Sequence, residues 1–135
     1  MATLAQKLKL KPSSLGALVS APDGYRHEIG PLPQGVQLVD SLKGQYDWIQ
    51  IFVKTQAELE KMLPRILKAL KPISIVWISY PKGTSGIQTD LTRDKGWDSL
   101  RGGGVLKRIT LVSVNDTWSA FALRPYKPGE ARESW

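Results

Sequence analysis

The chain contains no cysteine and only one histidine, His27, among its 135 residues. Without cysteine there is no disulfide bond, no thiolate nucleophile and no cysteine zinc site. A single histidine leaves a histidine metal site, or a Ser-His-Asp triad, without its usual members. Any function must therefore rest on acidic, hydroxyl, amide and basic groups.

Long apolar segments are also lacking. No stretch approaches the roughly 20 apolar residues that cross a bilayer. The N-terminal sequence MATLAQKLKLKPSS lacks the apolar core and the cleavage site of a signal peptide. These features predict a cytoplasmic protein. The length suits one domain, which we expect at residues 1–124, followed by a polar tail at 125–135.

Positive charge is the unusual bulk property, because 19 Lys and Arg against 12 Asp and Glu give a net charge of +7. Such an excess is typical of proteins that bind polyanions, since Lys and Arg displace counterions from nucleic acid. The basic residues are scattered, with the densest groups at Lys7, Lys9 and Lys11 and along residues 61–71. A well-solvated basic surface explains the same charge.

The N-terminal part of the chain predicts a short helix and two short strands. The sequence TLAQ at 3–6 has the spacing of a capping box, so a helix is expected from residue 4 to about 10. The apolar run 15–21 is typical of a buried strand, and 36–39 predicts another that ends on Asp40. The stretch between them is too broken for more than a turn or two of helix.

The middle of the chain has the pattern strand, helix, strand. Residues 47–53 predict a strand, and TQAE at 55–58 is a second capping box. Apolar residues at three- and four-residue spacing follow, so the helix should run to the Lys-Pro step at 71–72, with a kink at Pro64. The near-continuous apolar run 73–80 is typical of a strand covered on both faces.

A loop and a further helix follow that strand. The loop PKGTSGIQ leads to a helix expected from about residue 90 to 100. Trp97 and Leu100 should face inward from this helix. The glycines at 102–104 then end it, because glycine adopts the left-handed conformation of a C-terminal cap.

Two final strands, at 105–114 and 117–123, are separated only by Asn115-Asp116, so a tight antiparallel hairpin is expected. Both turn residues tolerate the positive φ of a two-residue turn. The alternating strands and helices before the hairpin predict a mostly parallel sheet. The predicted fold class is therefore α/β, a three-layer, mostly parallel sheet with an antiparallel C-terminal hairpin. In such sheets ligands bind beyond the carboxyl ends of the strands.

Parts of the sequence resemble known proteins. The passage from DWIQIFV through LPRILKALKP to ISIVWISYP resembles the second half of the Rossmann-like S-adenosylmethionine-dependent methyltransferases. In that fold a helix ending in Leu-Lys-Pro feeds the fifth strand, and an antiparallel hairpin closes the sheet. The segments SYPKGTSGIQTDLTRD and NDTWSAFALRP are similar to a family of small bacterial proteins that share a compact methyltransferase-like fold. This resemblance implies the fold and no particular activity.

The resemblance also implies where a cofactor would bind. Asp40 matches the acidic residue that holds the ribose hydroxyls, and Asp23 and Gly24 lie in the turn that approaches the cofactor. The turn SAPDGYRHEIG departs from the methyltransferases, whose turn is glycine-rich, and its side chains hinder a close backbone approach. The residues after Asp40 also leave no room for the helix-strand-helix unit that methyltransferases place there.

The loop after the central strand is the best candidate for a ligand site on the residues alone. It carries Lys82, Gly83, Thr84 and Ser85, and its backbone N–H groups are suited to bind an anion. It is not a P-loop, since Lys82 precedes the first glycine. An ordinary strand-to-helix loop explains the same glycines.

Two further groups are candidates with equally simple structural explanations. Arg93 is suited to bind a phosphate or carboxylate, whereas Asp90 is suited to cap the predicted helix. In the hairpin, Asn115 and Asp116 suit a turn, and Trp118 suits either stacking on a ligand ring or packing in the core.

No pair of carboxylates has a spacing that fixes acid and base roles, and no serine has an evident histidine partner, so no catalytic residue and no metal site is predicted. Three functions follow from the sequence. The first is a non-catalytic or cryptically active methyltransferase-like domain that binds a small anionic ligand or a protein partner. The second is an S-adenosylmethionine-dependent methyltransferase with a divergent cofactor loop. The third is a nucleic-acid-binding accessory protein.

Overall fold

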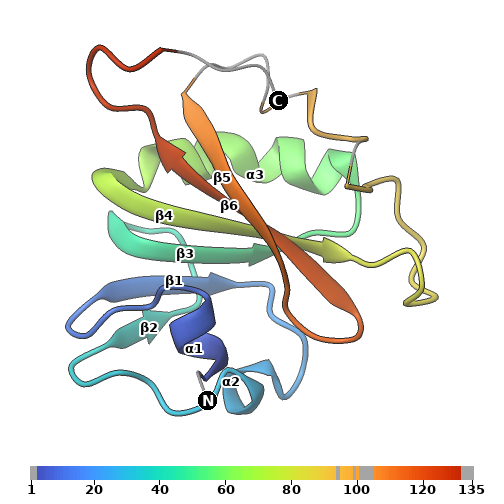
Figure 1. Ribbon diagram of the computed structural model, residues 1–135, viewed down its shortest axis with the longest axis horizontal. Coiled ribbons are helices and arrows are strands. Elements are labelled where there is room, and N and C mark those ends of the chain that lie inside the picture. The colour runs from blue at the N-terminus through green and yellow to red at the C-terminus, as the bar shows by residue number, and fades with distance from the viewer. Residues whose placement is uncertain (1–2, 94, 99, 101–104, 132–135) are drawn as a thin grey trace.

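The computed structural model describes residues 3–93, 95–98, 100 and 105–131, which form one six-stranded sheet with helices on both faces (Figure 1). The strands are β1 (Leu15–Val19), β2 (Gln37–Val39), β3 (Tyr46–Phe52), β4 (Leu70–Pro81), β5 (Leu106–Ser113) and β6 (Trp118–Pro125). The helices are α1 (Leu4–Lys7), α2 (Tyr25–Glu28) and α3 (Gln56–Lys68).

The strands lie in the order β2-β1-β3-β4-β6-β5. β1 pairs in parallel with β2 and β3, and β3 pairs in parallel with β4. β6 is antiparallel to both β4 and β5. This arrangement confirms the predicted α/β class, a mostly parallel sheet with an antiparallel C-terminal hairpin. Within the described residues, no helix has the length and apolar character needed to cross a membrane.

Alternating residues of the strands form a core on each face of the sheet, because successive side chains of a strand point to opposite sides. Ile49 and Val76 are among those that face α3. Trp48, Trp77 and Trp118 face the side covered by α1 and α2 and are only 1, 0 and 6% exposed. The expectation that strand tryptophans fill the core is confirmed.

The capping box at the start of α1 is confirmed. Thr3 Oγ1 accepts from the Gln6 amide at 3.2 Å, and the Thr3 amide donates to Gln6 Oε1 at 2.9 Å. The helix is shorter than predicted because Lys9 has a φ of +61°, and right-handed helix cannot continue through it. The amides of Lys9 and Leu10 then donate back to the Gln6 and Ala5 carbonyls, which closes the C-terminus in a Schellman motif.

Helix α3 begins as predicted and ends early. Thr55 Oγ1 accepts from the Glu58 amide at 3.1 Å, the first half of a capping box. The second half differs from the expectation, because the Glu58 carboxylate accepts from the Lys54 amide at 3.2 Å and not from the N-cap residue. The helix continues past Pro64 and ends at Lys68, and β4 begins two residues later, at Leu70. The predicted end at residues 71–72 therefore lies within the strand.

The helix expected at 90–100 is wrong for residues 90–93 and 95–97, which are not helical. A turn takes its place: the Thr92 amide donates to the Lys95 carbonyl at 3.0 Å, and the Lys95 amide donates to Thr92 Oγ1 at 3.1 Å. Gly96 then has a φ of +101°, which is incompatible with a right-handed helix.

Trp97 and Leu100 nevertheless face the core as predicted and are 1 and 3% exposed. The Trp97 indole N–H donates to the Thr92 carbonyl at 2.6 Å, and its ring packs edge-on against Tyr80 with centroids 5.2 Å apart. A non-helical segment therefore delivers the apolar side chains expected of a helix. The glycines at 102–104, predicted as a helix cap, lie outside the described residues.

The antiparallel hairpin of β5 and β6 is present, but the predicted two-residue turn is wrong. Residues 114–117 separate the two strands. The side-chain Oδ1 of Asn115 accepts from the amides of Thr117 and Trp118 at 2.8 and 2.9 Å. Neither Asn115 nor Asp116 has a positive φ. A side chain closes this turn, so no left-handed residue pair is needed.

Candidate functional site

The strand order places a topological switch point between β1 and β3. From β1 the chain passes to β2 on one side, and from β2 it crosses over to β3 on the other side. In open α/β sheets, ligands bind outside the carboxyl ends of the strands at such a point. Three hollows lie at this edge of the sheet, and together they contain most of the predicted site residues.

The first, the β1–β2 hollow, has a volume of about 440 Å³ and is formed by the turn after β1 and the end of β2. Asp23, Gly24 and Asp40 all line it, so the structure brings together the three residues that the resemblance implied. Arg26 also lines it, with its guanidinium donating to the Leu38 carbonyl at 3.2 Å. Within the described part of the chain, the Asp40 carboxylate has no hydrogen bond or ion pair and is exposed.

The turn after β1 reaches a tight conformation with a single glycine. Ser20 has a φ of +59° and Gly24 a φ of +81°, so two residues of the turn are left-handed and one of them carries a side chain. A Cβ added at Gly24 would meet no atom within 4 Å, so the space above the turn is open. The turn therefore forms with one glycine, because Ser20 takes a left-handed conformation. The expectation that side chains of this turn hinder a close backbone approach stays a prediction, with open space at Gly24.

Tyr25, directly after this turn, lies in the core below the hollow and is 2% exposed. Its hydroxyl donates to Gln50 Oε1 at 2.9 Å, and Gln50 Nε2 donates to Ser79 Oγ at 3.0 Å. Burial raises the pKa of the Tyr25 phenol far above its usual value. The neutral tyrosine supports the turn from beneath and does not fill the hollow.

The second, the β1–β3 hollow, lies at the switch point and measures about 630 Å³. Ser20 and Pro22 line it from the turn after β1, Phe52 and Lys54 from the end of β3 and just beyond it, and Glu58 from the first turn of α3. Sequence reasoning missed Lys54 and Glu58 as site residues, because the capping box accounted for Glu58 and Lys54 lay between the predicted strand and helix. Their place in the connection from β3 to the first turn of α3, at the switch point, is the signal that identifies them.

The third, the loop hollow, measures about 540 Å³ and lies beside the loop after β4. Lys82, Gly83 and Arg93 line it, so the structure brings the lysine of the loop and Arg93 to one hollow. Lys82 Nζ donates to Ser113 Oγ at 2.6 Å. Thr84 and Ser85 do not line the hollow.

The loop uses several of its own polar groups. The Ser85 amide donates to the Lys82 carbonyl at 3.0 Å, and Ser85 Oγ accepts from the Ile87 amide at 3.2 Å. The Lys82 amide donates to the Thr117 carbonyl at 2.8 Å. These three amides are not available to an anion. The Lys82 and Arg93 side chains are the cationic groups that line the hollow.

The remaining predicted residues have structural roles. Asp90 does not cap a helix of its own; its carboxylate accepts from the amide of Gln56, the first residue of α3, at 2.8 Å. Asn115 closes the hairpin turn and donates to Glu28 on α2 at 2.6 Å. Neither Asn115 nor Asp116 lines any of the three hollows, whereas Trp118 forms part of the wall of the β1–β3 hollow.

The three hollows form one continuous series. The β1–β2 and β1–β3 hollows share Ser20 and Pro22, and the β1–β3 and loop hollows share Ile87. An acidic group, Asp40, lies at one end, and two basic groups, Lys82 and Arg93, lie at the other. Among the described residues, no three His, Asp or Glu side chains are grouped so that they could hold a metal ion.

The sequence matches no protein-family model and no curated protein sequence. The fold does resemble solved structures. The DhpI-SAH complex has a TM-score of 0.61 and 10% identity, over 91% of this chain and 82% of the DhpI chain. A ribosomal protein L11 methylase from Lactobacillus delbrueckii subsp. bulgaricus has a TM-score of 0.57 and 14% identity, over 91% of this chain and 76% of its own.

A SAM-dependent methyltransferase from Aquifex aeolicus is a third such structure, with a TM-score of 0.55 and 15% identity, over 91% of this chain and 88% of its own. Identities this low show the fold alone. The chain therefore has a methyltransferase-like fold, as the resemblance of its sequence implied.

Proposed function

We propose that this chain is an S-adenosylmethionine-dependent methyltransferase whose cofactor binds across the β1–β2 and β1–β3 hollows. The observation that carries the proposal is the position of Asp40 and the left-handed turn at Ser20. Both border one hollow at the switch point, where this class of sheet binds its ligands. The solved methyltransferases with the same fold support the proposal.

The residues present suit the nucleoside part of that cofactor. A carboxylate at the end of the second strand accepts hydrogen bonds from ribose hydroxyls in Rossmann-like proteins, and the Asp40 carboxylate is exposed in this position. The open space over Gly24 lets a ligand approach the backbone there. When bound, the cofactor supplies a methyl group on a positively charged sulfur for transfer to a nucleophile.

The β1–β3 hollow is suited to hold the reacting groups. Its Glu58 carboxylate favours a positively charged sulfur nearby, and Pro22, Phe52 and Trp118 give it an apolar wall that excludes water. The methyl acceptor would enter from the loop hollow, where Lys82 and Arg93 would bind an anionic group on it. The anion-binding loop expected from the sequence thus becomes the substrate end of one site.

Titration calorimetry with S-adenosylmethionine and S-adenosylhomocysteine tests the cofactor site. Both ligands should bind, and Asp40→Asn should weaken each by about tenfold or more, because the ribose loses a charged hydrogen-bond acceptor. Asp116→Asn is the matched control, since this exposed aspartate lies outside the three hollows. The proposal fails if neither ligand binds at about 1 mM, or if the two variants behave alike.

A domain that binds the cofactor without turnover is the alternative, and a second measurement separates it. We expect wild-type protein incubated with S-adenosylmethionine and a library of phosphorylated and carboxylated acceptors to release S-adenosylhomocysteine. Arg93→Gln should reduce that release and leave cofactor affinity unchanged. Cofactor binding without any release would retain the first half of the proposal and overturn methyl transfer.

A further inference from the structure

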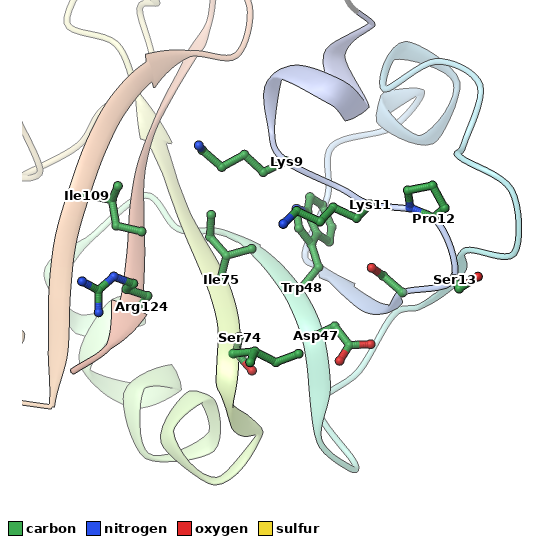
Figure 2. A pocket seen from close by; sticks show the side chains of 12 residues that line it. Lys9, Lys11, Pro12, Ser13, Asp47, Trp48, Ser74, Ile75, Ile109 and Arg124 are labelled. Atoms are coloured by element: carbon green, nitrogen blue, oxygen red, sulfur yellow. The ribbon is translucent and has the colours of Figure 1, made fainter. Parts of the chain in front are cut away.

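A fourth hollow, of about 570 Å³, lies at the opposite edge of the sheet, near the amino ends of the parallel strands (Figure 2). We call it the amino-end groove; its walls include Lys9, Lys11, Trp48, Ile75, Ile109 and Arg124. It lies on the face that α1 and α2 cover only in part. It shares no lining residue with the three hollows at the carboxyl ends.

The groove has a basic wall and an apolar floor. Figure 2 shows the side chains of Lys9 and Lys11 extending from the linker between α1 and β1 toward Ile109 and Arg124 of the β5–β6 hairpin. Ile75 lies between the two walls. A ligand in the groove would therefore contact ammonium groups on one side and aliphatic carbon beneath.

Aliphatic side chains here are unusually exposed. Ile73 is 79% exposed and Ile109 is 42% exposed, although strand isoleucines are normally buried. Exposed apolar surface rimmed by polar groups is typical of a binding site. Trp48 contributes only the edge of a buried ring, since it is 1% exposed. Among the described residues that line it, the groove thus offers aliphatic contact and no exposed aromatic face on which a nucleic-acid base could stack.

The charge of the groove is positive on its lysine side. Within the described residues, Lys9 and Lys11 form no ion pair and are exposed. The Asp47 carboxylate at the groove floor is already engaged, accepting from the Leu15 amide at 2.9 Å and from Lys71 Nζ at 3.0 Å. The Arg124 guanidinium is held by Glu130 through two hydrogen bonds of 2.9 and 2.8 Å. The two lysines are therefore the groups that would attract an anion.

Lys9 occupies a position at which its side chain costs stability. It is the left-handed residue after the α1 C-cap, where glycine is favoured because it has no Cβ. A second left-handed residue, Ser13, lies in the same linker and also lines the groove. Strained residues that persist tend to cluster at functional sites. A lysine where glycine would be more stable is thus consistent with a role for its ammonium group.

We infer that the amino-end groove binds a small amphiphilic anion. Its aliphatic body lies on Ile73, Ile75 and Ile109, and its carboxylate or phosphate lies between Lys9 and Lys11. The volume suits a small molecule, and apolar lining with a few polar groups is typical of such sites. This site is separate from the proposed cofactor site, so each can fail without the other.

Octyl phosphate and octanoate are suitable probes, with inorganic phosphate and 1-octanol as controls that carry only the charge or only the chain. Calorimetry should show that both amphiphiles bind more tightly than either control. In ¹H–¹⁵N spectra the perturbed amides should be those of residues 9–11, 13, 14, 73–75 and 109. The difference between the two head groups identifies whether a phosphate or a carboxylate is preferred.

Lys9→Gly is the decisive variant, because it removes the cation and relieves the left-handed backbone. It should raise the unfolding temperature and weaken octyl phosphate binding by about fivefold to tenfold. Lys11→Gln should weaken binding similarly, and Ile109→Thr should do so by loss of aliphatic contact. Lys61→Gln, an exposed lysine on α3, is the control and should change nothing.

Three results would overturn the inference. Inorganic phosphate could bind as tightly as octyl phosphate, which would make the site a plain anion site. Affinity could be unchanged in both Lys9→Gly and Lys11→Gln. A single-stranded oligonucleotide could displace octyl phosphate with a strong salt dependence, which would assign the groove to polyanions.

Discussion

Trp48 on β3 and Trp77 on β4, two residues apart in the register of the paired strands, donate their indole N–H groups to one acceptor, the main-chain carbonyl of Leu8, at 2.8 and 2.7 Å. Leu8 is the C-cap of α1, where the last carbonyls of a helix lack partners within the helix. The two tryptophans supply that partner from the sheet. This contact fixes α1, and with it the linker that carries Lys9 and Lys11, to the middle of the sheet.

The shared acceptor predicts a specific coupling between the two tryptophans. Either Trp48→Phe or Trp77→Phe leaves the Leu8 carbonyl with one donor, whereas the double variant leaves it buried without either. The double variant should therefore be less stable than the sum of the single losses, by about 1 kcal/mol. Urea unfolding of the four proteins measures this. Trp118→Phe, whose indole makes no hydrogen bond within the described residues, should show no such coupling with Trp77→Phe.

The Asp47 carboxylate, near the start of β3, links the starts of β1, β3 and β4. It accepts a hydrogen bond from the Leu15 amide in β1 and another from Lys71 Nζ in β4. The hydrogen bond from the Leu15 amide, followed by that from Lys71, lowers the pKa of the Asp47 carboxyl below its usual range. A group with a lowered folded pKa stabilises the fold above its unfolded pKa of about 4. This contribution to stability is lost as the pH falls from about 4 through the lower pKa that Asp47 has in the folded protein.

Asp47→Asn should therefore be less stable than wild type at pH 7 by about 1 kcal/mol, and the difference should shrink as the pH is lowered below about 4. Thermal unfolding from pH 7 to pH 2.5 checks this. Asp116→Asn, in the exposed hairpin turn, is the control. A constant difference between wild type and Asp47→Asn at every pH would contradict the assignment.

The order and type of most elements were predictable, because apolar periodicity and capping spacing are local. The run 73–80 predicted a strand because it is almost continuously apolar. Thr55 predicted a helix start because its hydroxyl reaches the amide three residues on. The segment 90–97 was not predictable in this way. Its conformation depends on Asp90 contacting Gln56 at the start of α3, a contact that sequence separation conceals.

The candidate cofactor site remains a prediction, and only its grouping could be compared with the structure. The resemblance to methyltransferases implied Asp23, Gly24 and Asp40 together, and all three line one hollow, although they follow two different strands. The left-handed Ser20 could not be foreseen, because nothing in its neighbours distinguishes it from an ordinary strand end. The amino-end groove was also missed, because it combines a linker, two parallel strands and the hairpin, which are far apart in sequence.

Ser20 gives a direct test of whether its turn conformation costs stability. A non-glycine residue at a φ of +59° is disfavoured, so Ser20→Gly should stabilise the protein by about 1 kcal/mol. Cofactor affinity should be retained, because the backbone of the turn is unchanged. Equilibrium unfolding and calorimetry on the same variant measure both. A lower free energy of unfolding in Ser20→Gly would contradict the proposed backbone strain at Ser20. It would mean that the Ser20 side chain itself stabilises the turn.

Gly96 is the position where a side chain should be tolerated least. Its φ is +101°, and an added Cβ would lie 2.5 Å from Leu91 Cδ2 and 3.2 Å from the Asp90 carbonyl oxygen. The second contact is with backbone that adjoins the start of α3, so it cannot be relieved by a side-chain rotation. Gly96→Ala should therefore destabilise the protein by about 2–3 kcal/mol, from crowding and conformational strain together.

Gly129→Ala separates these two causes. Gly129 also has a positive φ, +78°, but an added Cβ there would meet no atom within 4 Å. This variant should lose only the conformational part, about 1 kcal/mol. Urea unfolding measures the loss of unfolding free energy in each variant. Equal losses would mean that the segment around Gly96 shifts to accommodate the Cβ without further loss of stability. Asp90 would then not be held rigidly against α3, and the wall of the loop hollow that Arg93 forms would have to be regarded as adjustable.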